Sequence, residues 1–261
     1  EETMTGYDAT GWDASTWILH AMYENPSLTG LGTHDDLHRR RLVAGDIAPV
    51  IIGEVNLDEV TTVTGTHLGF VIRPGQPWQR VRWTEYLART RNFTGDRTYP
   101  PCHRWFPPGS WPVSIEPPLE GSLDEESLHA LLQILSAPSP AGPETESTAF
   151  YGALPAGDFD SPHVWQGPLE SVPDLIEDNG GSYPSSPTNL WPADRSWLAW
   201  TDWDLQGTKI SGSQWLIRAI HSTDQLETVG WTPDTHSDHA RCPRVAGLAR
   251  PAHRAVIEEL R

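Results

Sequence analysis

Residues 196–205 have the sequence Ser-Trp-Leu-Ala-Trp-Thr-Asp-Trp-Asp-Leu, and this stretch decides the fold that we expect. It is rich in tryptophan and is bounded by turn-forming residues, which is typical of a central strand. Residues 207–210 are expected to pair with it as a shorter strand. Ser211-Gly212-Ser213 then predicts the start of a helix that continues to about His221, because a serine hydroxyl can accept a free backbone amide at a helix start.

Capping signals predict two further helices. Ser122-Leu123-Asp124-Glu125 has the pattern of a capping box, and it precedes leucines that recur at helical spacing. Those leucines are Leu128, Leu131, Leu132 and Leu135. Thr33-His34-Asp35-Asp36 is a second capping box, and Gly45 is the expected end of its helix. On that helix, ion pairs are expected between Asp35 and Arg39 and between Asp36 and Arg40.

Other segments are predicted from periodicity and from turn residues. An apolar stripe predicts a helix at 12–23, and shorter or terminal helices are expected at 83–89 and 251–261. β-branched runs at 50–52, 60–64 and 67–72 predict an antiparallel meander, and single strands are expected at 111–115, 148–154 and 226–231. A proline-, serine- and glutamate-rich stretch at 136–147 predicts a mobile loop.

These elements indicate an α+β protein with a mainly antiparallel sheet, helices packed on one side of it, and long Pro/Gly-rich loops. Strands and helices do not alternate regularly enough for a parallel sheet. The predicted organisation is an N-terminal α+β lobe at 4–110 and a Trp-rich C-terminal α+β lobe at 111–261, or one continuous domain.

Composition restricts the classes of partner. The formal net charge of −17 disfavours nucleic acid and favours a protein partner with a basic surface. No apolar stretch is long enough to span a membrane, and no signal peptide is visible, so the expected location is the cytoplasm.

A binding site is predicted at the end of the tryptophan-rich strand. If residues 196–205 are extended, Asp202 and Asp204 lie on the same face as Leu198 and Trp200, while Trp197 and Trp203 lie on the other. Two carboxylates beside an aromatic ring can bind a cation, and Lys209 can neutralise one of them across a hairpin. The predicted binding residues are Trp200, Asp202, Trp203, Asp204 and Lys209.

Histidines and cysteines suggest two other sites. His236, His239 and Cys242 are spaced as zinc ligands, with Cys102 or His103 as a fourth, while the alternative is a solvated loop. His34 and His38 echo the helix of zinc metalloproteases, but Asp replaces the glutamate base, so surface histidines on an ion-paired helix are the preferred interpretation. Nucleophile-elbow and nucleotide-binding motifs are absent from the sequence.

Two stretches carry a resemblance to other proteins. Residues 16–24, Thr-Trp-Ile-Leu-His-Ala-Met-Tyr-Glu, and 191–197, Trp-Pro-Ala-Asp-Arg-Ser-Trp, running on to Gly212-Ser213, are similar to segments of an uncharacterised actinobacterial protein family. Some proteins with a segment similar to the second resemble immunity-type, toxin-neutralising modules. The resemblance implies a binding role and supplies no catalytic motif.

Two functions follow as hypotheses. The first is a non-catalytic intracellular protein-interaction or immunity-type accessory protein that needs no cofactor. The second is a metal-dependent hydrolase that uses the His/Cys site, with zinc, or the paired aspartates. The sequence does not decide whether the chain is an enzyme.

Overall fold

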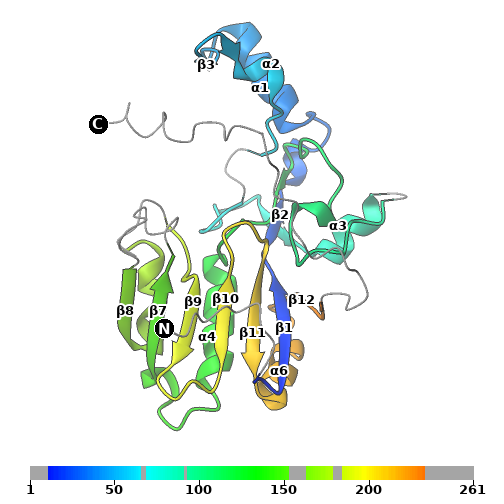
Figure 1. Ribbon diagram of the computed structural model, residues 1–261. Helices are drawn as coiled ribbons and strands as arrows, with labels where there is room; N and C mark the ends of the chain where they lie inside the picture. Colours follow the sequence, from blue (N-terminus) through cyan, green and yellow to red (C-terminus); the bar gives the residue numbers. More distant parts are fainter. Residues whose placement is uncertain (1–10, 66–68, 91–92, 153–162, 179–183, 233–261) are drawn as a thin grey trace.

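The computed structural model describes residues 11–65, 69–90, 93–152, 163–178 and 184–232. Its largest unit is an antiparallel seven-stranded sheet, shown in Figure 1. In spatial order the strands are β12 (Thr228–Val229), β1 (Ala14–Leu19), β11 (Gly207–Gly212), β10 (Leu198–Thr201), β9 (Asn189–Pro192), β7 (Glu146–Tyr151) and β8 (His163–Pro168).

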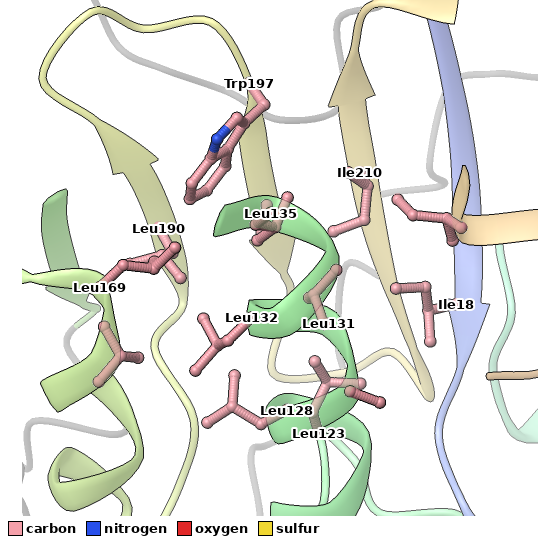
Figure 2. Close-up of a cluster of buried hydrophobic side chains, with 14 of the residues drawn as sticks. Ile18, Leu123, Leu128, Leu131, Leu132, Leu135, Leu169, Leu190, Trp197 and Ile210 are labelled. Carbon is pink, nitrogen blue, oxygen red and sulfur yellow. The ribbon is translucent and has the colours of Figure 1, made fainter. Parts of the chain in front are cut away.

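Helices cover one face of this sheet. They are α4 (Glu125–Ser136), α6 (Gln214–His221) and the 3-10 segment η4 (Leu169–Ile176). Figure 2 shows the leucines of α4 pointing toward Ile18, Leu190 and Ile210 of the sheet. The four leucines predicted for α4 form its buried face, since residues three and four apart lie on one side of a helix. The α+β class, with helices packed on a mainly antiparallel sheet, is confirmed.

The helix predicted at 12–23 is wrong, because this segment forms β1 and the short strand β2 (Met22–Glu24). β1 lies between β12 and β11, with Ile18 facing the helices and Trp17 facing the other side. The second half of β1 is buried on both faces, and there Trp17, Ile18 and Leu19 follow one another without a polar residue. Such a run has no period that distinguishes a strand from a helix.

β1 also bears on the predicted lobes. It belongs to the same sheet as strands from the second half of the chain, so the division at residue 110 does not coincide with a boundary of this sheet. A smaller sheet has the order β5 (Gln79–Val81), β2 and β6 (Ile115–Glu116). The helix predicted at 83–89 forms as α3 (Trp83–Arg89). The smaller sheet packs with α3 and with η2 (His103–Trp105) around a second core that contains Trp83, Trp105 and Phe106.

The segment 26–65 projects from the sheets (Figure 1). It contains η1 (Pro26–Leu28), α1 (His34–Ala44), β3 (Ile51–Ile52), β4 (Val55–Asn56) and α2 (Leu57–Val60). The Thr33–Asp36 capping box forms, and Gly45 ends α1 in the left-handed conformation, as predicted.

The meander predicted at 50–72 is wrong. Only the β3–β4 hairpin forms, Val60 lies in α2, and the described parts of 61–72 contain no strand. The Asn56 side chain accepts the Asp58 amide and so starts α2. The β-branched residues here are largely exposed, with 66% of Val60 accessible, so β propensity finds no sheet on which to pack.

Two boundaries in the second half differ from prediction. α4 is capped by Asp124, which accepts the Ser127 amide, whereas the Ser122 hydroxyl bonds to Ser186. The loop predicted at 136–147 includes the 3-10 turn η3 (Gly142–Glu144) and the first residues of β7. The helix predicted at 251–261 lies outside the described residues. Within the described ranges, no helix is long and apolar enough to span a bilayer.

Candidate functional site

The predicted strand 196–205 ends earlier than expected, at Thr201. The Asp202 carboxylate accepts the Asp204 amide at 3.0 Å, and the Leu205 amide donates to the Asp202 carbonyl at 3.0 Å. These two hydrogen bonds close a turn between β10 and β11. The prediction that both aspartates lie on one face of a strand is therefore wrong, because the Asp202 side chain stabilises a turn in place of extended backbone.

The residues before this turn follow the predicted alternation. Trp197 belongs to the core under the helices, and Trp200 lies on the opposite face. The predicted hairpin forms, with Trp200 directly opposite Lys209, and Lys209 directly opposite Trp17 of β1. The rings of Trp17 and Trp200 meet edge to face at 5.9 Å. Trp200 and Lys209 therefore lie in a cross-strand row on the face without helices, and not in the turn with the aspartates.

A segment remote in sequence lies against the turn. The Gly121 amide donates to the Leu205 carbonyl at 2.9 Å, and Gly121 has a φ of +72°. A Cβ atom at this position would lie 2.9 Å from the Trp203 Cα, closer than two carbons can pack. Glycine therefore allows the two backbones to touch, and this contact places Glu120 beside the turn. We call Glu120 together with Asp202–Leu205 the acidic turn.

The carboxylates of the acidic turn repel one another. Burial raises the pKa of Glu120, and the charge of Asp204 raises it further. Burial also raises the pKa of Asp204, with a further increase from Asp202 and a decrease from His103. Within the described part of the chain, Glu120 and Asp204 form no ion pair. A cation that binds here would relieve this repulsion.

An exposed tryptophan lies at the centre of the acidic turn. Trp203 is 55% accessible, although its backbone is held by Gly121. A second tryptophan, Trp215 on α6, is 50% accessible, but its helix neighbours are Gln214 and Arg218. The two side chains are similarly exposed, but Trp203 lies between Asp202 and Asp204, whereas α6 (Gln214–His221) contains no acidic residue.

Sequence reasoning did not identify Glu120 and Gly121 as part of this site. In the sequence, Glu120-Gly121 before a helix start is typical of an ordinary loop. The contact that makes the pair part of the site is with the turn at 202–205, far along the chain. The two aspartates were recognised as a candidate pair, but from the period of a strand and not from the preference of Asp for turns.

The predicted zinc site is not described by this structure. His236, His239 and Cys242 lie outside the described residues. Cys102 is buried and burial raises the pKa of its thiol, which favours the protonated form, whereas His103 is exposed. Across the described ranges, no group of three or more His, Cys, Asp and Glu side chains is arranged to hold a metal. Zinc binding by the three terminal ligands stays a prediction.

The two histidines of α1 point to different partners. His34 is buried and its Nε2 lies 3.2 Å from the Ile115 carbonyl, while the His38 Nε2 lies 2.6 Å from the Asp58 carboxylate. The prediction that His34 is a surface histidine is therefore wrong, because this side chain anchors α1 to the smaller sheet. The Asp35–Arg39 ion pair forms, but Arg40 donates to the Asp36 carbonyl oxygen and not to its carboxylate.

A buried polar junction joins β1 and β11 to the segment before α4. The His20 Nδ1 lies 2.5 Å from the Leu119 carbonyl, and its Nε2 lies 3.0 Å from the Thr208 hydroxyl. The carbonyl can only accept, so Nδ1 carries the proton, Thr208 donates to Nε2, and Thr201 donates to Thr208 at 2.7 Å. Nearby, the Tyr23 hydroxyl donates to the buried Asp124 carboxylate. Every group in this network has a partner.

Comparison with known proteins does not assign this chain to a family. A scan against protein-family models, a search of curated proteins and a search of solved structures each found no match for this chain.

Proposed function

We propose that this chain is a non-catalytic protein-interaction protein, of the immunity or accessory type, that binds a partner with a basic surface through the acidic turn. The observation that carries the proposal is the exposed Trp203 among carboxylates whose pKa values are raised.

The charges of the acidic turn favour a cationic partner. Bringing a lysine or arginine of the partner near Glu120 and Asp204 would stabilise their ionised forms and lower their pKa values. The net charge of −17 would also steer a basic protein toward this chain, and the association would weaken as salt increases.

Trp203 supplies the apolar part of the same contact. Tryptophan is among the residues that contribute most to binding energy at interfaces, and its ring face attracts a guanidinium or ammonium group. Since Gly121 holds the backbone of Trp203 close, the side chain is presented from a fixed turn. Less entropy is then lost when a partner binds.

Catalysis has less support. The buried polar junction brings His20, Tyr23 and Asp124 close together, but His20 is fully buried and both of its ring nitrogens are hydrogen bonded. A hydrolase that uses His236, His239 and Cys242 stays a prediction from the sequence.

The experiment compares the full chain with variants at the two exposed tryptophans. Proteins captured on the wild-type chain but lost on Trp203→Ala are identified, purified, and titrated against each chain by calorimetry at two salt concentrations. We expect Trp203→Ala to weaken binding at least tenfold, about 1.4 kcal/mol. Glu120→Gln and Asp204→Asn should slow association mainly at low salt.

Trp215→Ala is the matched control, because it removes a similarly exposed ring from α6, a helix without acidic residues. It should bind as the wild type does. The proposal fails if Trp203→Ala binds as tightly as Trp215→Ala, or if the wild-type chain retains no protein that the variant loses.

A further inference from the structure

The two edges of the seven-stranded sheet differ in length. β12, at one edge, has two residues, whereas β8, at the other edge, has six. Natural sheets protect their edges with very short strands, charged side chains, proline or bulges, because the free backbone groups of an edge strand can pair with another chain. β12 is protected because it is very short, whereas β8 is too long to be protected in this way.

β8 also lacks the charges that usually protect an edge. Its sequence is His-Val-Trp-Gln-Gly-Pro, without acidic residues, lysine or arginine. It pairs with β7 along its whole length, and among the strands that the structure describes it has no neighbour on its outer side (Figure 1). Pro168 is the last residue of the strand, and within the described residues no strand pairs with the alternate backbone groups of 164–167 that point outward.

An apolar surface lies next to this edge. Val164 is 58% accessible and lies directly opposite the half-buried Phe150 of β7. Opposed residues of an antiparallel pair point to the same face. Ala149 and Tyr151 point to the helix-covered core, so Phe150 and Val164 lie on the face without helices.

We propose that β8 pairs antiparallel with β8 of a second copy of this chain and continues the sheet across a two-fold axis. Each copy would satisfy the edge of the other, and the contact closes at a dimer. Val164 and Phe150 of the two copies would form one apolar patch. An uncharged strand offers nothing specific to the basic partner proposed above, which favours a second copy at this edge.

Charge distinguishes this dimer from other associations. Each copy has a net charge of −17, so the two copies repel at a distance, although the paired strands themselves are uncharged. Salt screens this repulsion, and the dimer should therefore tighten as salt increases. Binding of a basic partner at the acidic turn has the opposite salt dependence.

The test is analytical ultracentrifugation of the full chain from about 1 to about 300 µM, the range suited to a small interface, at low and high salt. We expect a monomer–dimer equilibrium that shifts toward dimer with salt. Val164→Lys should raise the dimer dissociation constant by at least about tenfold, since it places like charges across the two-fold axis. Val43→Lys, at a 91% accessible position on α1, makes the same change elsewhere and should leave the equilibrium unaltered.

Hydrogen exchange supplies a second measurement. Amides in 164–167 should exchange more slowly in concentrated samples than in dilute ones. Gln166→Lys should abolish this difference, and it replaces Val164→Lys as the test variant if Val164→Lys does not fold. A chain that stays monomeric over the whole range overturns the inference. So does a dimer that tolerates both lysine variants or protects a different segment, and neither outcome bears on binding at the acidic turn.

Discussion

The buried polar junction and the acidic turn both contain ionisable side chains, and they differ in whether those side chains have partners. In the junction, Asp124 accepts from Tyr23 and from the Ser127 amide, and His20 is hydrogen bonded at both ring nitrogens. In the acidic turn, Glu120 and Asp204 raise each other's energy, and Trp203 is exposed. A satisfied network stabilises the fold, whereas uncompensated charges at the surface cost stability and favour a partner.

The largest expected effect is the pH dependence that His20 imposes on the junction. Burial lowers the pKa of His20 to about 4, whereas an unfolded histidine titrates near 6.5. The unfolded state therefore binds more protons between these values, and stability falls as pH falls from 6.5 toward 4. The loss should reach about 3 kcal/mol, measured by urea unfolding at each pH.

His20→Gln should be less stable at neutral pH, because a buried hydrogen-bonded group is replaced, but it should lack this part of the pH dependence. The same substitution at the exposed His129 is the control and should leave the wild-type slope. Parallel curves for the wild type and His20→Gln between pH 4 and 6.5 would contradict the assignment.

A smaller effect is expected from Tyr23→Phe, which leaves a buried oxygen of Asp124 without its donor. The expected loss of unfolding free energy is about 1–3 kcal/mol, measured by denaturant unfolding at pH 7. Tyr99→Phe, at a 42% accessible position, should change stability by much less. Equal losses in the two variants would show that the Tyr23–Asp124 contact does not stabilise the junction.

The smallest effect, of opposite sign, is expected in the acidic turn. The raised pKa of Glu120 means that the folded state binds more protons than the unfolded state between the two pKa values, so stability falls as pH rises through this window. Glu120→Gln should therefore stabilise the chain at pH 7 by less than about 1 kcal/mol, because the site is partly solvated. The gain should vanish in acid, where the wild-type carboxyl is protonated. Destabilisation by Glu120→Gln at pH 7 would remove the evidence for repulsion.

The residues of the acidic turn could be predicted from the sequence in part, and those of the buried polar junction were not predicted. Asp202 and Asp204 were recognised as a possible binding pair, but their placement on a strand was wrong because the Asp202 side chain competes with the sheet for backbone amides. Glu120, in a loop, and His20, within an apolar stretch, were both missed, because neither local pattern indicates a partner that is distant in the chain.

The sequence by itself determined the elements that depend on neighbours in the chain. The α1 capping box, the leucine face of α4, the serine cap of α6 and the β10–β11 hairpin all follow from interactions between nearby residues. Only the tertiary structure decided that Thr16-Trp17-Ile18 is a strand, since two flanking strands supply its backbone partners. It also decided the acidic turn, because Gly121 and Trp203 meet through backbone contact that no local pattern encodes.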